Sequence, residues 1–140
     1  MKARKTEEIL TEEGLATYAA LGRAADWSVK RVEAVVGRSD QHWATIYFDW
    51  VINGMYSRNV LPQNIRELCA VAALTVQRSD SELESHIHYA LGLNPVESVK
   101  EVILQMGVYA GVPAAHNGLR ILEKVLASRK AKGLDIPKAG

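Results

Sequence analysis

The sequence predicts an all-helical protein. Apolar residues recur every three or four positions along most of the chain, which is the period of a helix with one buried face. No segment shows the alternation of apolar and polar residues that is typical of a strand, and no turn signal joins two such segments. A chain of 140 residues is long enough to bury a core, so we expect one domain, residues 1–140, with flexible ends at 1–6 and 133–140.

The composition excludes several classes of function. Hydrophobic residues make up 48% of the chain and charged residues 24%, which is ordinary for a globular protein. The net charge of +1 argues against a nucleic-acid partner, and the longest apolar run, Leu68 to Leu74, is too short for a membrane partner. Acidic residues follow the first few positions before any apolar segment, so we expect no signal peptide. The single Cys69 fits a reducing, cytoplasmic location.

Two helices are expected before residue 38. The first begins at Thr6 or Thr11 and runs to about Ala24; the second is short, beginning at Ser28 and ending before Gly37. The inner face of the first helix is expected to consist of Leu15, Tyr18, Ala19 and Leu21.

Ser39 and Asp40 are suitable caps for the next helix. It carries a broad stripe of apolar and small residues: Trp43, Ile46, Tyr47, Trp50, Val51, Gly54 and Met55. Such a stripe is more often a core face than a ligand site, and its width would also suit a contact with a partner subunit. Residues 56–59 then form a polar turn.

A helical hairpin from Leu61 to His88 organises the chain. Its first helix begins at Pro62, because a first-turn proline loses no hydrogen bond, and is apolar nearly all round, which indicates a central helix. Its expected buried face is Ile65, Leu68, Cys69, Ala72 and Val76. Residues 77–80 form the turn, and the second helix runs from near Asp80 to Gly92 with Leu83, Ile87, Ala90 and Leu91 facing inward.

Two further helices complete the chain. Residues 94–97 supply a cap, a first-turn proline and a capping-box glutamate, and residues 111–113 interrupt the helical pattern. The apolar positions before the break are Val99, Val102, Ile103, Met106 and Tyr109, and those after it are Ala115, Leu119, Leu122, Val125 and Leu126.

Most residues that could carry chemistry lie on the hairpin. Glu82 and His86 are four residues apart, so they share one helix face, with His86 at its inward edge. A carboxylate beside a histidine holds the imidazole in one orientation and stabilises its charged form, as a general acid requires. Spacing alone favours an ordinary surface pair over a catalytic one. His88 aligns with Glu84, away from the inner face, and is expected to be solvated.

Other candidates have ordinary alternatives as well. Glu67 could meet His86 across the hairpin, or form an ion pair with Arg66 or Arg78. Cys69 is expected to behave as a small buried hydrophobe rather than as a nucleophile. His116, in the first turn of the last helix, is either a surface cap residue or part of a carboxylate site at the helix N-terminus. No HExxH or paired ExxH motif is present, so we expect no metal.

The hairpin and the segment after it resemble the carboxymuconolactone decarboxylase family, which also includes the alkylhydroperoxidase D proteins. The likeness covers about residues 43–126. Its most specific parts are the ELxxH pattern of residues 82–86 and the run EVILQMGVYAGVPAA of residues 101–115. The resemblance implies an alkylhydroperoxidase D-like helical bundle around the hairpin, assembled as a homotrimer or homohexamer.

The resemblance also indicates a branch of the family. The peroxidase branch has a glutamate and a histidine that match Glu67 and His86, with a CxHC motif between them. The motif's two cysteine positions and its histidine position hold Ser79, Glu82 and Ser81 here. A disulfide relay is therefore impossible within one chain, and the sequence looks more like the decarboxylase branch, in which the pair equivalent to Glu82 and His86 is typical.

Three positions depart from the decarboxylase pattern. The family often has Asn-Asn-Gly where this chain has residues 92–94, and Ala-Ala-Asn-His where it has residues 114–117. It also favours WxRPGL where this chain has residues 56–61. These departures surround the expected pocket, so the resemblance indicates the family more firmly than the substrate.

The resemblance implies a lyase without a cofactor that acts on a small carboxylated lactone or a related unsaturated acid, in aromatic-compound catabolism. We expect His86 as proton donor, oriented by Glu82 or Glu67, and Arg66, His116 and Tyr109 as substrate-binding residues. The alternatives are a non-catalytic protein of the same fold that binds a small acid or acts in assembly, and a redox protein that uses Cys69.

Overall fold

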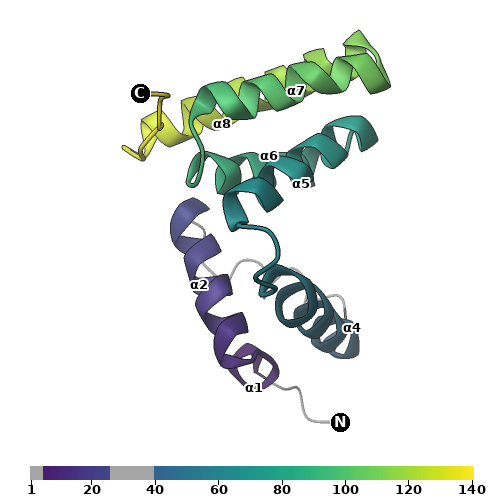
Figure 1. Ribbon diagram of the computed structural model, residues 1–140, viewed down its shortest axis with the longest axis vertical. Helices are drawn as coiled ribbons and strands as arrows, with labels where there is room; N and C mark the ends of the chain where they lie inside the picture. The colour runs from purple at the N-terminus through teal and green to yellow at the C-terminus, as the bar shows by residue number, and fades with distance from the viewer. Residues whose placement is uncertain (1–4, 26–39) are drawn as a thin grey trace. The chain divides into compact units, whose positions relative to one another are not determined.

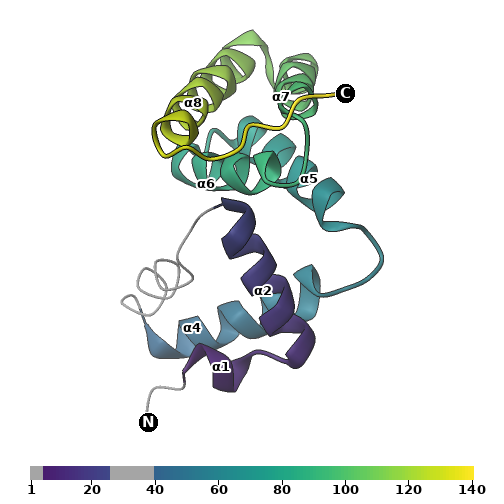
Figure 2. The same cartoon turned by 90° about the vertical axis from the view of Figure 1, so that its left-hand side faces the viewer.

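The computed structural model describes residues 5–25 and 40–140, and the regular elements in these residues are all helices, which confirms the all-helical class. The chain divides into two compact units, Met1–Leu61 and Pro62–Gly140. Figures 1 and 2 show the helices of each unit. The short helix expected between Ser28 and Gly37 lies outside the described residues.

The first unit contains α1 (Thr6–Ile9), α2 (Glu12–Ala25), α4 (Gln41–Tyr47) and the π-helix η1 (Phe48–Tyr56). Two expected caps are present. The Thr11 hydroxyl accepts a hydrogen bond from the Gly14 amide at 3.0 Å, and Asp40 Oδ1 accepts one from the Trp43 amide at 2.8 Å. Each oxygen satisfies an amide that has no partner inside its helix.

The core of this unit differs from the expected one. It is built from Leu10, Tyr18, Phe48 and Ile52, whereas Trp43, Ile46, Trp50 and Met55 of the expected stripe are exposed. Residues Phe48–Tyr56 form a π-helix, whose buried residues are Phe48 and Ile52. On α2, Leu15 is exposed as well, while Tyr18 and Leu21 are buried as expected.

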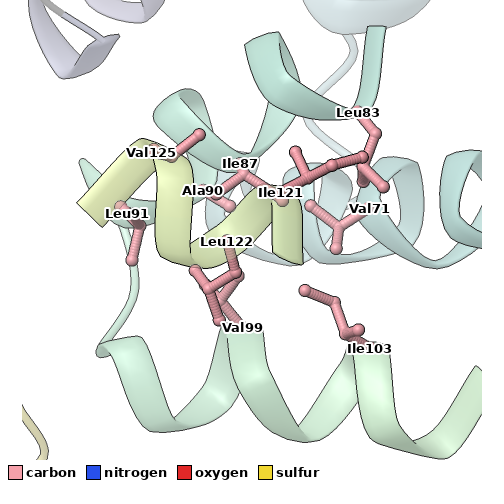
Figure 3. Close-up of a cluster of buried hydrophobic side chains, with 10 residues drawn as sticks. All are labelled: Val71, Leu83, Ile87, Ala90, Leu91, Val99, Ile103, Ile121, Leu122 and Val125. Carbon is pink, nitrogen blue, oxygen red and sulfur yellow. The ribbon is translucent and has the colours of Figure 1, made fainter. Parts of the chain in front are cut away.

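The second unit is a bundle of four helices: α5 (Gln63–Gln77), α6 (Asp80–Leu91), α7 (Val96–Ala110) and α8 (Val112–Ala131). Helix α5 packs against α6 and α7, and α8 packs against the same two helices and against α5. Buried aliphatic side chains from all four helices meet in one interior (Figure 3). The bundle therefore holds α5 and α6, which carry most of the candidate residues, against a continuous core.

The buried face of α5 is not the one the sequence suggested. Glu67, Val71 and Thr75 are fully buried, whereas Ile65, Cys69 and Val76 are exposed. A helix that is apolar on nearly every side gives no periodic signal for the face turned inward. The Thr75 hydroxyl donates to the Val71 carbonyl at 2.7 Å, which allows a polar residue to lie in the core.

The start of α7 also differs from the expected capping box. Pro95 occupies the cap position, and no side chain caps the helix. Asn94 is buried instead, and its side-chain amide donates to the carbonyls of Asn64 and Ala90, both at 3.1 Å. Asn94 thus joins the beginning of α5 to the end of α6.

The segment after α8 follows a defined path, although the sequence suggested a loose tail. The Arg129 guanidinium is buried and donates to the Asp135 carbonyl at 2.9 Å. The Pro137 carbonyl accepts from the Val96 amide at 2.8 Å, and the Ala139 amide donates to Glu97 at 2.9 Å. Asp135 is therefore bonded to α8, and residues 137–139 are bonded to the first turn of α7.

The bond between Ala139 and Glu97 predicts a pH dependence. The pKa of the Glu97 carboxyl is lowered from its ordinary value of 4.5, first by the Ala139 amide and then by the amide of Glu97 itself. A carboxyl whose pKa is lower in the folded state stabilises that state above the unfolded pKa, and this effect is lost as the pH falls through the folded pKa. Acid should therefore release the tail.

We expect the Ala139 amide resonance to shift during an NMR titration, with a midpoint below 4.5. In Glu97→Gln this shift should be absent, while Glu101→Gln, an exposed position on the same helix, should behave like the wild type. An Ala139 resonance that ignores acid in the wild type would show that Glu97 does not hold the tail.

Candidate functional site

The α5–α6 hairpin is closed by a tight turn. Arg78 ends α5 in the left-handed conformation, with φ of 54°, and the Ser79 amide bonds back to the Leu74 carbonyl at 3.2 Å. This conformation reverses the chain within two residues, so α6 returns directly along α5 (Figure 1). Residues near the start of α5 consequently face residues in the second half of α6.

Glu67 and His86 meet across this hairpin. His86 Nδ1 lies 2.8 Å from Glu67 Oε2, and the Glu67 side chain is completely buried while that of His86 is 22% exposed. With Glu67 ionised, the N–H at Nδ1 donates a hydrogen bond to the carboxylate. Nε2 is then the ring nitrogen left for a ligand. This is the contact that the hairpin arrangement predicted, while the catalytic role of the two residues stays a prediction.

The second oxygen of Glu67 has an unusual environment. Oε1 is buried and has no hydrogen-bond partner among the residues that the structure describes. A buried carboxylate is costly unless it is paired, so Glu67 depends strongly on the one bond to His86. Oε1 also remains open to a further hydrogen-bond donor.

Glu82 does not form the pair with His86 that its spacing allowed. It lies in the first turn of α6 and is exposed, whereas the bond to His86 comes from Glu67 on the facing helix. Of the two carboxylates considered as partners for His86, the structure therefore pairs it with Glu67.

His88 was expected to be solvated, and this prediction is wrong. The residue is buried, and its backbone carbonyl accepts a hydrogen bond from the Arg129 guanidinium at 3.3 Å. Helix α6 packs against both α5 and α8, so two of its faces are covered. The spacing of apolar residues along α6 predicted only one covered face.

The three expected substrate-binding residues occupy different places. Arg66 is half-buried and precedes Glu67 on α5. His116, in the second turn of α8, and Tyr109, at the end of α7, are exposed, and neither forms a hydrogen bond or ion pair with Glu67 or His86. The start of α8 does lie beside the start of α6, because Asn117 Nδ2 donates to Asp80 Oδ1 at 2.7 Å.

Tyr89 is a neighbour of His86 that the sequence argument missed. The two rings form an edge-to-face contact, with centroids 5.4 Å apart and an interplanar angle of 71°. The available signal was its position three residues after His86, which places the two side chains on one side of α6.

Cys69 lies on the exposed side of α5, which corrects the expectation of a buried thiol. It follows Glu67 by two residues, a spacing that puts the two side chains on nearly opposite sides of a helix. The thiol therefore points away from the Glu67–His86 pair.

The described residues also bear on metal binding and on membrane insertion. No three side chains of histidine, cysteine, aspartate or glutamate lie close enough together there to hold a metal ion. Within the same residues, no helix combines the length and the apolar character needed to cross a membrane.

Comparison with known proteins finds a family match over a segment that includes the α5–α6 hairpin. Residues 42–124, more than half of the chain, match the carboxymuconolactone decarboxylase family. The chain therefore belongs to this family, as its motifs indicated, and Glu67 and His86 both lie within the matched segment. One relative is a 4-carboxymuconolactone decarboxylase of Acinetobacter baylyi, 31% identical over 72 residues. That alignment covers 51% of this chain and 54% of the relative, so the chain spans about half the relative's length.

The buried pair predicts an asymmetric response to mutation. His86→Ala leaves the Glu67 carboxylate buried without its partner, and we expect a loss of about 2–3 kcal/mol in the free energy of unfolding. This is less than for a fully buried pair because His86 is partly exposed. Replacing the carboxylate too, in Glu67→Leu/His86→Ala, should recover most of the loss.

Urea unfolding measures both variants. The exposed His116→Ala is the control and should stay within about 0.5 kcal/mol of the wild type. If His86→Ala proves as mild as this control, the carboxylate does not depend on the imidazole.

Proposed function

We propose that this protein is a lyase that needs no cofactor and removes carbon dioxide from a small carboxylated lactone or a related unsaturated acid. The observation that carries the proposal is the contact between the buried Glu67 and the partly exposed His86, within the segment that matches the decarboxylase family. Histidine positioned by a carboxylate is suited to proton transfer near neutral pH.

The chemistry requires a proton donor and a site for negative charge. As the bond between the ring carbon and its carboxylate breaks, carbon dioxide leaves and the electron pair is delocalised toward the lactone carbonyl oxygen. A proton must then be delivered to carbon. His86, held at Nδ1 by Glu67, donates this proton from Nε2, and the carboxylate stabilises the imidazolium before the transfer.

Groups near the hairpin bind the oxygen atoms of the substrate. Arg66 is adjacent to Glu67 in sequence and supplies a permanent positive charge for a carboxylate. The N-terminus of α8, with His116 and Tyr109, is a further candidate for holding carboxylate or enolate oxygens.

Turnover of His86 variants is the direct test. The first compound to assay is 4-carboxymuconolactone, the substrate in the name of the Acinetobacter relative, with release of carbon dioxide as the readout. His86→Ala should lower kcat by about 100-fold or more, as expected for loss of a general acid. His86→Asn should lose the same activity but keep a donor to Glu67, and hence most of the stability.

Glu84→Gln is the matched control, since Glu84 lies on the same helix and pairs with Lys124 at 2.7 Å, away from His86. It should keep its full rate. Near-normal turnover in His86→Ala would remove His86 from the mechanism. A wild type that binds small carboxylated lactones in calorimetry and releases no carbon dioxide from them would instead identify a binding protein of the same fold.

A redox function through Cys69 is a second candidate, favoured only by the exposure of that thiol. Alkylation with iodoacetamide tests it, because a Cys69 that does not react in the native protein cannot exchange disulfides.

We also propose that the protein forms a homotrimer or homohexamer. Large apolar side chains are exposed at the end of α7 and the start of α8, where Val108 is 80%, Tyr109 72% and Val112 60% exposed. Exposed apolar side chains gathered in one place are typical of a surface that another chain covers.

Sedimentation velocity should therefore give a mass of three or six chains for the wild type. Val108→Glu should reduce that mass, because it places a charge in the proposed interface. Lys100→Glu, an exposed polar position earlier on α7, should leave it unchanged. A monomeric wild type would contradict the proposal.

A further inference from the structure

The bond to Glu67 leaves the His86 ring incompletely fixed. The imidazole moves by rotation about its two side-chain torsions, and one hydrogen bond, 2.8 Å long at Nδ1, restrains them from one side only. A swing of the ring about these torsions bends the bond to Glu67 and moves Nε2 sideways. A proton donor that moves in this way loses the alignment on which transfer to carbon depends.

Tyr89 supplies the missing constraint. Its ring stands at 71° to the imidazole plane, with 5.4 Å between the centroids, which is the geometry that aromatic pairs prefer. The contact restrains the same swing from a second side of the ring. Glu67 and Tyr89 therefore restrain one ring together, and loss of the Tyr89 ring weakens the bond to Glu67.

The backbone beneath Tyr89 is fixed relative to the helix that carries Glu67. His88 and Ala90, the residues on either side of Tyr89, are both buried. The Asn94 side chain donates to the carbonyls of Ala90 and Asn64, which joins this end of α6 to the start of α5. Tyr89 on α6 and Glu67 on α5 thus contact His86 from two helices that the Asn94 side chain links through hydrogen bonds.

We propose that Tyr89 is a positioning residue that fixes the plane of the His86 ring, so that Glu67 and Tyr89 together present Nε2 in one direction. The effect of Tyr89 on turnover rests on the proposed function. Its effect on the orientation and tautomer of the His86 ring does not depend on that function.

Two variants of Tyr89 distinguish the effect of the aromatic ring from the effects of the hydroxyl group and of side-chain volume. Tyr89→Leu keeps an apolar side chain with good helix propensity and removes the aromatic ring. We expect kcat to fall roughly two- to ten-fold with KM within about two-fold, because the usual strength of a ring pair corresponds to that factor. Tyr89→Phe should restore kcat, and Glu84→Gln is again the matched control on α6.

The state of the ring can be read without any substrate. Nitrogen-15 NMR of the His86 side chain reports which ring nitrogen carries the proton. In the wild type and in Tyr89→Phe we expect the proton on Nδ1, held by Glu67. In Tyr89→Leu the bond to Glu67 should loosen, and the form with the proton on Nε2 should become measurable.

The outcomes are distinct. A change of tautomer in Tyr89→Leu, reversed in Tyr89→Phe, supports the inference even if the wild type proves inactive on every lactone and the proposed function fails. If Tyr89→Leu has the wild-type tautomer, and the wild-type kcat wherever turnover is measurable, Tyr89 only fills space and the inference is wrong. A lowered melting temperature without either change has the same meaning.

Discussion

The second unit is organised by the need to keep one buried carboxylate paired. The Glu67 side chain is completely buried, and in the described part of the chain the only hydrogen bond of its carboxylate is to His86. That bond requires α6 to return along α5 with His86 opposite Glu67, which the left-handed Arg78 makes possible. Once Glu67 faces inward, Cys69 must face outward. The exposed thiol and the protected pair are two results of one helix orientation.

Much of the path of the chain could be predicted from the sequence, because caps and breaks are local features. The turn around Arg78, the cap at Asp40 and the break at Gly111 all lie where the residues indicated. Helix faces were harder, because α5 has apolar residues on every side. Its inner face contains Glu67 and Thr75, two residues that a hydrophobic pattern assigns to the surface.

The candidate site was predicted in part for similar reasons. The contact between Glu67 and His86 could be anticipated because a tight hairpin brings those positions together. Glu82 and His88 were placed wrongly because spacing along α6 does not reveal that α5 and α8 cover two of its faces. Asn94, which departs from the family pattern, links α5 to α6 through its side-chain amide. Patterns within a short segment could not predict this link, because the two acceptors belong to different helices.

The tied tail has a consequence for synthesis of the protein. The bonds of Val96 to Pro137 and of Glu97 to Ala139 join residues about forty positions apart. Domains fold as units while the chain emerges from the ribosome. The bonds between the first turn of α7 and residues 137–139 therefore form only after the whole of α8 has been synthesised.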